Sequence, residues 1–248
     1  MNYPFVFINM AMSADGKIAS VNHVVSSIGS ENDFEHLLAL RATADAVMSG
    51  ARTVNSGNIN LGPGPAPYRR LRIKNGLAEY NLRVIVSGTG SINPRAEIFR
   101  HRFSPIVILT TARAGRKKLR RLREVADDVH ICGEDKIHFH QTLTWLRKAW
   151  RIESLLCEGG GELNDALFRA GLVAELNLTV CPEILGGRAA PTIADGRGAS
   201  RLADTTRLRL KSQNRAGDEC FLVYEVVNAT GHPVNDRRRI ALSRSSEP

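Results

Sequence analysis

The chain has 248 residues, a formal net charge of +9, and 43% hydrophobic and 24% charged residues; these values are close to those of globular proteins and predict a sizeable core in one large α/β domain or two small ones. No apolar run approaches the roughly 20 residues that cross a bilayer, and the N-terminal residues lack the cationic segment and cleavage site of a signal peptide. The four cysteines show no C-x-x-C spacing, which disfavours a disulfide framework or a zinc site and favours a reducing, cytoplasmic location.

Apolar runs alternate with helical patterns along most of the chain. The runs predict strands at Phe5–Met12, Ala46–Ser49, Arg83–Ser87, Ile106–Thr110, Val129–Cys132, Ser154–Cys157, Leu176–Cys181, Arg207–Ser212 and Glu219–Val226. Helices are predicted at Glu31–Ala42, Gly115–Val125, Gln141–Ala149 and Glu162–Arg169. This rhythm predicts an α/β fold with a mostly parallel central sheet, helices on both faces and a C-terminal antiparallel hairpin. We expect one domain over residues 1–228 and a loosely ordered, polar and basic tail over residues 229–248.

The first predicted helix has a recognisable start. Ser30 is its expected N-cap, and Asp33 occupies the reciprocal position of a capping box. Phe34, Leu37 and Leu38 are expected to face the core, because they lie at helical spacing.

The segment 116–123 is strongly basic, with six Lys or Arg residues in eight. Two interpretations are open: a nucleic-acid-binding patch, or the solvated face of an amphipathic helix. Leu119 and Leu122 lie at helical spacing within the run, and no aromatic residues interrupt it, so the second interpretation is favoured.

Three consecutive glycines, Gly159 to Gly161, stand between an apolar strand pattern and a helical pattern. Such a turn places unpaired backbone N–H groups of a helix N-terminus where a ligand can approach closely. The helix dipole favours negative charge there, so the turn is a candidate phosphate site, the alternative being a tight connection that binds nothing.

Three other predicted strands also end in residues that suit ligand binding. These ends are residues 9–19, 49–54 and 109–113. In the first, an Asp-Gly turn presents Lys17, and in the third, two hydroxyl residues precede Arg113. Since parallel strands bind ligands at their carboxyl ends, the four ends together predict a cleft lined with anion-binding groups. His138 and His140 have no supporting carboxylate cluster, and no metal site is expected.

In combination, three of these motifs resemble the riboflavin-pathway pyrimidine reductases: residues 9–19, residues 45–54 and the run Cys157 to Gly161, followed by similar segments up to Gly187. The similarity covers residues 5 to 226, and no deaminase motif accompanies it. The resemblance implies a stand-alone form of the reductase domain at the C-terminus of RibD-type proteins, with a single-domain, dihydrofolate-reductase-like fold. It also implies a cytoplasmic homodimer, for which Leu176–Cys181 is a plausible apolar edge strand.

The resemblance further implies that the chain is an NADPH-dependent oxidoreductase that reduces the ribosyl group of a phosphorylated aminopyrimidine to ribityl. Lys17 and Glu158 would be its catalytic residues. The residues implied to bind NADPH are Thr53, Val54, Thr110, Arg113, Gly159, Gly160, Gly161 and Glu162. The residues implied to bind substrate are Asn9, Lys17, Ser30, Arg41 and Asn58. Arg113, Arg116 and Lys117 follow a strand end and are candidates for pairing with a 2′-phosphate.

The chain departs from the family pattern between Gly57 and Gly64. An acidic residue of the family is replaced by Gly57, and a downstream arginine that would hold the substrate phosphate is missing. Arg69, Arg70 or Arg72 is a candidate to replace it from nearby. The glycine- and proline-rich segment from Gly57 to Ala66 is expected to be an active-site loop or lid rather than part of the core.

Because of this departure, two further functions stay open. One is a reductase of the same fold that acts on dihydrofolate, another pterin or a secondary-metabolite precursor. The other is a basic nucleic-acid-binding protein that has lost catalysis.

Overall fold

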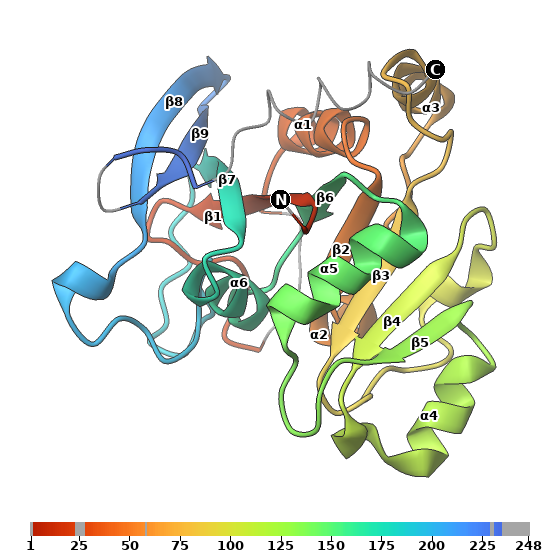
Figure 1. Ribbon diagram of the computed structural model, residues 1–248. Coiled ribbons are helices and arrows are strands. Elements are labelled where there is room, and N and C mark those ends of the chain that lie inside the picture. Colours follow the sequence, from red (N-terminus) through yellow and green to blue (C-terminus); the bar gives the residue numbers. More distant parts are fainter. Residues whose placement is uncertain (1, 23–27, 58, 229–230, 235–248) are drawn as a thin grey trace.

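The computed structural model describes residues 2–22, 28–57, 59–228 and 231–234, and these form one sheet with helices on both faces (Figure 1). The sheet has nine strands in the order β5-β4-β3-β2-β6-β1-β7-β9-β8. The strands from β5 to β7 run parallel, and β9 and β8 are antiparallel to their neighbours. The predicted α/β class, parallel sheet and C-terminal hairpin are therefore confirmed.

The strands are β1 Phe5–Ser13, β2 Ala46–Gly50, β3 Leu82–Ser87, β4 Ile106–Thr110, β5 Asp128–Ile131, β6 Ser154–Cys157, β7 Val173–Cys181, β8 Arg207–Ala216 and β9 Glu219–Val227. The helices are α1 Glu31–Arg41, α2 Ala51–Ser56, α3 Ala66–Lys74, α4 Gly115–Arg123, α5 Phe139–Trp150 and α6 Gly161–Arg169. All nine predicted strands and all four predicted helices are present, whereas α2 and α3 were not predicted.

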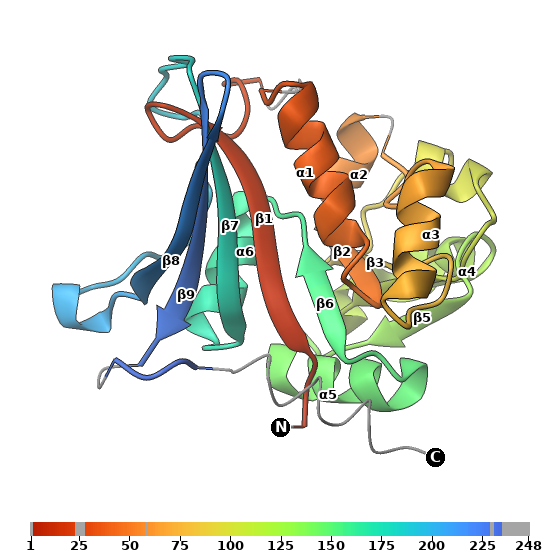
Figure 2. The ribbon, with the colours of Figure 1, turned by 90° about the horizontal axis from the view of Figure 1, so that it is seen from above.

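Alternation along β1 divides the core between the two faces of the sheet. Val6 and Ile8 pack with α5 and α6 on one face, and Phe5 and Phe7 belong to the core of the opposite face, which includes Val54 of α2. Figure 2 shows α1 and α6 on opposite sides of β1. The side chain of Asn9 therefore belongs to the α1 face.

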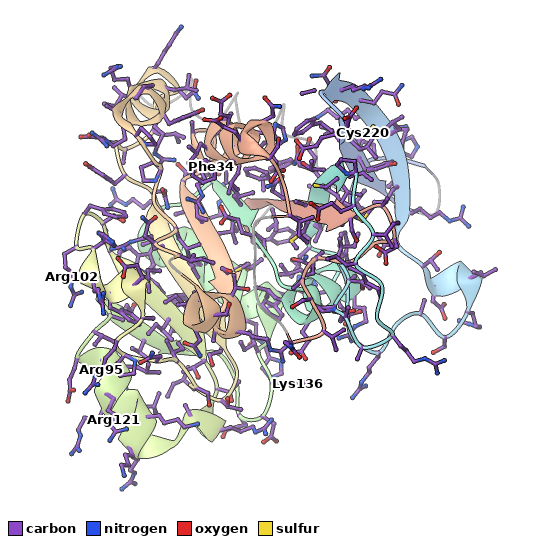
Figure 3. The ribbon with its side chains drawn as sticks, turned by 180° about the vertical axis from the view of Figure 1, so that it is seen from behind. Phe34, Arg95, Arg102, Arg121, Lys136 and Cys220 are labelled. Carbon is purple, nitrogen blue, oxygen red and sulfur yellow. The ribbon has the colours of Figure 1, made fainter. Side chains whose placement is uncertain are left out.

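Helix α1 begins as predicted but is held differently. Ser30 is its N-cap, and the Ser30 hydroxyl accepts a hydrogen bond from the backbone N–H of Asn32. The reciprocal bond predicted for Asp33 is instead made by Glu219 of β9, whose carboxylate accepts from the backbone N–H of Ser30 at 2.7 Å. The prediction that Phe34 faces the core is wrong: its side chain is 53% exposed, and Leu38 is the buried residue of this stripe (Figure 3).

One prediction about the edges of the molecule also needs correction. Strand β7 is not an edge strand, because β9 pairs with it, and the exposed edge beyond β9 is β8. Of the predicted tail the structure describes residues 231–234, where the backbone N–H of Val234 donates to Val226 O at 3.0 Å, and the prediction for the rest of the tail lies outside the described residues.

The basic run forms α4, in which Leu119 and Leu122 are buried, as the amphipathic interpretation predicted. None of the described helices has both the length and the apolarity needed to span a bilayer. Among the described residues, no group of His, Cys, Asp or Glu side chains is arranged to hold a metal ion.

Candidate active site

A pocket of about 660 Å³ lies over the carboxyl ends of the central strands. Its wall begins at β1, passes the glycine turn after β6 and the start of α2, and ends at the segment that follows β3. The lining residues are Met10, Ile18, Ala19, Gly50, Ala51, Arg52, Thr53, Asn55, Val86, Ser87, Gly88, Thr89, Ser91, Phe139, Glu158, Gly160, Gly161, Glu162, Leu163, Ala166, Pro191 and Asp195. The lining residues come from the ends of four neighbouring strands, β3, β2, β6 and β1, so the pocket has the elongated shape that an extended ligand requires.

The glycine turn needs glycine for steric reasons at two positions. Gly159 has φ +72°, and a Cβ there would lie 2.6 Å from Met10 Sδ. A Cβ on Gly161 would meet Asp195 and the backbone of Thr192. The peptide bond between Gly159 and Gly160 is cis. At Gly160 only Thr53 Oγ1 comes within 4.0 Å of the added atom, so this glycine leaves the wall open.

Helix α6 starts directly at this opening. Gly160 is its N-cap, and no side chain caps the helix. Within the first turn the backbone N–H of Leu163 donates to Gly160 O at 3.0 Å, which leaves the N–H groups of Gly161 and Glu162 for a ligand in the pocket. This arrangement, together with the helix dipole, is suited to an anionic group such as a diphosphate.

The wall beyond β3 is a short turn from Ser87 to Ser91 that β4 and α4 hold in place. The hydroxyls of Thr110 and Thr111 donate to Ser87 O at 2.7 Å and to Gly88 O at 2.6 Å. Lys118 of α4 donates to Thr89 O at 3.0 Å and to Ser91 Oγ at 2.9 Å. A cationic group therefore stands beside two residues that line this end of the pocket.

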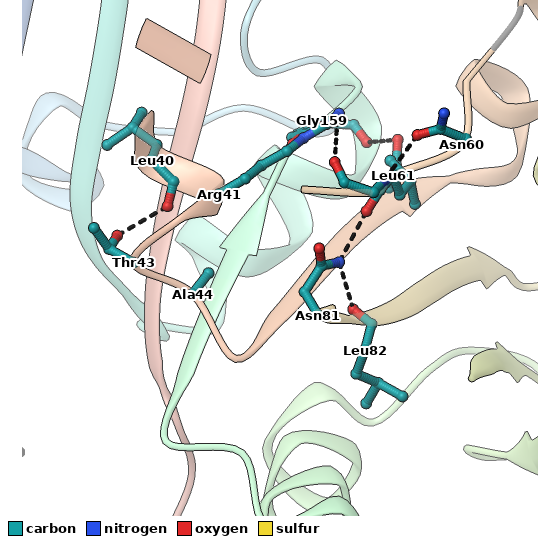
Figure 4. A network of polar contacts seen from close by, with 12 residues as sticks. Leu40, Arg41, Thr43, Ala44, Asn60, Leu61, Asn81, Leu82 and Gly159 are labelled. Atoms are coloured by element: carbon teal, nitrogen blue, oxygen red, sulfur yellow. Dashed lines mark hydrogen bonds and ion pairs between the residues drawn. The ribbon is translucent and has the colours of Figure 1, made fainter. Parts of the chain in front are cut away.

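Arg41 and Glu158 form a buried ion pair at the end of the pocket near β1. Arg41 Nε and Nη2 lie 2.6 and 2.7 Å from the two carboxylate oxygens of Glu158, and Arg41 Nη1 donates to Gly62 O at 2.7 Å. Figure 4 shows Arg41 extending from the end of α1 toward Gly159 and Leu61. The pair fixes the carboxylate of Glu158 in the pocket wall.

The Gly57–Ala66 segment is not a solvent-exposed lid over its described residues. Leu61 is fully buried in the core and adopts φ +54°. Its carbonyl accepts from Asn81 Nδ2 at 2.8 Å, and Asn60 Oδ1 accepts from the backbone N–H of Gly62 at 2.8 Å (Figure 4). These contacts anchor the segment against Arg41.

Of the nearby arginines, Arg72 has a structural role. It is fully buried and donates to the carbonyls of Arg41, Ala44 and Ala78, which closes the connection between α1 and β2. Burial lowers the pKa of Arg72 to about 10, so the guanidinium stays charged at neutral pH. Its Nε and Nη1 groups donate to these backbone oxygens, and Nη2 is buried without a hydrogen-bond partner.

The loop after β1 is fixed around Lys17. Ser13 Oγ accepts from the backbone N–H of Lys17 at 3.0 Å and donates to Asp15 at 2.6 Å, and Asp15 accepts from the backbone of Gly186. The hydrogen bonds to Ser13 and to the backbone at 185–186 lower the pKa of Asp15. Lys17 Nζ lies 3.3 Å from Ala190 O and is partly exposed.

The structure brings together, in the pocket wall, four of the eight residues that the sequence singled out for the cofactor and one of the two predicted catalytic residues, Glu158. Thr53, Glu158, Gly160, Gly161 and Glu162 all line the pocket. Gly159 supports it from behind, because its carbonyl accepts from the backbone N–H of Gly50 at 2.8 Å. Their roles in binding stay predictions.

Other singled-out residues lie outside the pocket lining. Val54 is buried in the core, Thr110 is fully buried behind the turn after β3, and Arg113 is exposed. Asn9, Ser30 and Arg41 lie on the α1 face of β1 or on α1 itself. Asn58 lies outside the described residues.

Sequence reasoning missed the turn from Ser87 to Ser91 and the contact of Lys118 with it. A signal was present, because Gly88-Thr89-Gly90 directly follows a predicted strand. Thiol chemistry is not available in the pocket wall: burial raises the pKa of Cys157 to about 12, so this side chain is not a thiolate at neutral pH.

Comparisons with known proteins agree with this geometry. The model of a family described as the RibD C-terminal domain matches residues 4–222. The chain is 30% identical, over 92% of its length and 99% of the relative, to the 2,5-diamino-6-ribosylamino-4(3H)-pyrimidinone 5′-phosphate reductase of Aquifex aeolicus. It is 31% identical, over 90% of its length and 98% of the relative, to the protein of the same name from Methanothermobacter thermautotrophicus. The solved structure of a pyrimidine reductase-like protein from Corynebacterium diphtheriae has a similar fold, with a TM-score of 0.76 and 23% identity over 91% of this chain and 92% of that one.

Proposed function

The chain belongs to the RibD C-terminal domain family, and on this premise we propose that it is an NADPH-dependent reductase of riboflavin biosynthesis. Its substrate is a (di)aminopyrimidine ribosylamino 5′-phosphate, whose ribosyl side chain becomes a ribityl chain. The observation that carries this proposal is the pocket that crosses from β1 to β3 past the uncapped N-terminus of α6. Residues 1–228 form the reductase domain.

The pocket fits a dinucleotide in both chemistry and extent. The backbone N–H groups at the start of α6 would hold its diphosphate, with Thr53 and the open position at Gly160 on either side. The end near β1, lined by Met10, Ile18 and Ala19, is apolar enough for a nicotinamide ring. When bound, the reduced nicotinamide supplies the hydride that C1′ of the open-chain imine form of the substrate receives.

The preference for NADPH over NADH rests on Lys118. At the far end of the pocket this ammonium group is held beside Thr89 and Ser91, where it can pair with a 2′-phosphate. Lys118 is exposed and outside the pocket lining, as are Arg113, Arg116 and Lys117, which were the first candidates. Its contacts with Thr89 and Ser91, which line the pocket, distinguish it from these three.

In this proposal the substrate lies on the α1 face of β1 and faces the nicotinamide across Glu158. Glu158 stands at the junction, because it lines the pocket and is held by Arg41 of α1. Its fixed carboxylate can accept hydrogen bonds from amino or hydroxyl groups of the substrate. Lys17 and Ser30, from the loop after β1 and the start of α1, provide a cation and a hydroxyl for the phosphorylated chain.

A direct assay tests the proposal. The purified protein is mixed with NADPH and the ribosylaminopyrimidine phosphate in its 2-amino or its 2-oxo form, and cofactor oxidation is followed together with isolation of the ribityl product. Dihydrofolate is the competing substrate in the same assay. Oxidation with a pyrimidine and not with dihydrofolate supports the proposal, and turnover of dihydrofolate alone would refute it.

Two further properties are part of the proposal: a homodimer and a cytoplasmic location. With β7 covered by β9, the edge at this end of the sheet is β8, where Leu208 and Leu210 are exposed, and we propose this edge as the contact with a second copy. Sedimentation of the wild-type chain and of a Leu208→Lys, Leu210→Lys variant tests this surface.

A further inference from the structure

One wall of the pocket is formed by residues 190–195, here named the strap, which lie in the connection between β7 and β8. Pro191 and Asp195 of the strap line the pocket. The strap belongs to none of the described helices and strands, since β7 ends at Cys181 and β8 begins at Arg207. Its position therefore depends on the contacts that it makes with neighbouring segments.

On one side the strap is joined to the loop after β1. The backbone N–H of Ile18 donates to Pro191 O at 2.9 Å, and Lys17 Nζ donates to Ala190 O at 3.3 Å. Lys17 and Thr192 also form an isolated antiparallel bridge. Figure 2 shows the loops after β1 and β7 side by side at the carboxyl ends of these strands. The strap is thus attached to the loop that carries the predicted catalytic residue Lys17.

On the other side the strap rests on the first turn of α6. The backbone N–H of Asp195 donates to Gly161 O at 3.0 Å. A Cβ on Gly161 would lie 2.5 Å from both Asp195 Oδ2 and Thr192 O, so the strap and the helix are in direct contact. The Asp195 carboxylate also accepts from the Thr192 hydroxyl at 2.7 Å, which closes the strap on itself. The strap therefore spans the distance from the loop after β1 to the N-terminus of α6.

One buried side chain, Asn164 of α6, connects the strap to the sheet beneath the pocket. Asn164 is fully buried, and its Nδ2 donates to Ile193 O at 2.8 Å. Its Oδ1 accepts from Cys157 Sγ, at the end of β6, at 3.6 Å. Burial raises the pKa of Cys157 to about 12, so the thiol keeps the proton that it donates. Asn164 thus joins β6, α6 and the strap.

We propose that Asn164 is a positioning residue for the cofactor: by holding Ile193 O it keeps Pro191 and Asp195 in the wall of the pocket that binds NADPH. This inference rests on the proposed function and adds to it a residue that does not itself line the pocket. Without the amide donor, Ile193 O loses its partner in the protein and the strap gains by moving toward solvent. The displacement is expected at this wall, because no strand pairing holds the strap in place.

The experiment removes the donor and measures cofactor binding. Asn164→Leu replaces the amide by an apolar group of similar volume. It is expected to raise the Kd for NADPH about tenfold, as measured by fluorescence titration. The KM for NADPH is expected to rise with it. At saturating NADPH, kcat with the ribosylaminopyrimidine phosphate is expected to stay within about twofold of wild type, because a filled pocket supports the strap from its inner side.

Asn81→Leu is the matched control for Asn164→Leu. Asn81 is also fully buried, and its Nδ2 donates to a loop carbonyl, Leu61 O, at the same distance of 2.8 Å. Neither Asn81 nor Leu61 lines the pocket. Asn81→Leu is expected to lower the melting temperature about as much as Asn164→Leu and to leave the Kd for NADPH within about twofold of wild type. The comparison separates positioning from a general loss of stability.

Thr192→Val tests the strap from its partly exposed side, where a change does not endanger folding. It removes the hydroxyl that donates to Asp195 and is expected to raise the Kd for NADPH about threefold, with little change in the melting temperature. If Asn164→Leu does not fold, this variant decides.

Two results would overturn the inference and leave the proposed function in place. One is a Kd for NADPH that is the same in wild type, Asn164→Leu and Thr192→Val. The other is an equal loss of NADPH affinity in Asn164→Leu and Asn81→Leu, which would show that reduced stability alone weakens binding. If wild type does not bind NADPH at all, the proposed function fails and the inference fails with it.

Discussion

The buried pair of Arg41 and Glu158 gives a quantitative test of how the pocket wall is held. Its two charge-assisted hydrogen bonds measure 2.6 and 2.7 Å, and the side chains are 9% and 12% exposed. Such bonds contribute about 1.5–3 kcal/mol each, so Arg41→Met is expected to reduce the free energy of unfolding by about 3–5 kcal/mol, because it leaves a buried carboxylate unpaired.

A double-mutant cycle with Glu158→Gln isolates the pair. The bond from Arg41 to Gly62 O is lost in both the single Arg41→Met variant and the double variant, so it cancels in the cycle. We expect a coupling free energy of about 2 kcal/mol or more, measured by urea unfolding at neutral pH with circular dichroism as the readout.

Arg52 and Glu162 form the control pair, because Arg52 of α2 likewise binds a glutamate that adjoins the glycine turn after β6. Their contact is 3.3 Å long, and the side chains are 63% and 71% exposed. An exposed pair of this kind is expected to couple by about 0.2–1 kcal/mol. Equal coupling free energies for the two pairs would show that burial does not strengthen the Arg41–Glu158 contact and would refute the reasoning.

Three further predictions concern the cofactor and pH. Lys118→Ala is expected to raise the KM for NADPH about tenfold and to leave the KM for NADH unchanged, whereas Lys117→Ala changes neither; steady-state kinetics with both cofactors check this. Gly159→Ala is expected to destabilise the protein by about 2 kcal/mol or more, because of its positive φ and the approach of Met10, and to weaken NADPH binding, as fluorescence titration and thermal unfolding would show. The pKa of Asp33 is raised by burial in the fold, so ionisation of this carboxyl group destabilises the wild-type protein as the pH rises above about 4. The free energy of unfolding of Asp33→Asn, relative to that of wild type, should therefore increase from pH 4 to pH 8. A difference between the two proteins that does not change with pH would contradict the raised pKa of Asp33.

The strands could be predicted from the sequence because their signals are local. Buried runs such as Ile106–Thr110 are continuous and apolar, as expected of parallel strands covered on both faces. Helix α2 has six residues with one buried side chain, and α3 is arginine-rich, so neither carries a clear apolar stripe. Prolines 65 and 67 at the start of α3 were the available signal, and they indicate a turn as readily as a helix start.

The sequence indicated individual residues of the candidate site, but it did not indicate the contacts between segments that lie far apart in the chain. The glycine turn was recognisable because its chemistry lies in five consecutive residues. Arg41 and Glu158 each suited a ligand, and nothing in the sequence indicated that they bind each other across the fold. Arg72 was misleading for a similar reason, since an arginine in a polar helix is usually solvated, and here it is buried against three carbonyl oxygens.

The position of β1 in the middle of the sheet has a consequence for synthesis of the chain. Both neighbours of β1, the strands β6 and β7, are encoded far downstream, so the first strand leaves the ribosome without a pairing partner. At about 5–20 residues per second, the nascent apolar segment stays uncovered for roughly ten seconds or longer. Non-local parallel pairing is slow and leaves apolar segments open to aggregation. We therefore expect the nascent chain to need chaperones during this interval, and the yield of refolded protein to fall as the protein concentration rises.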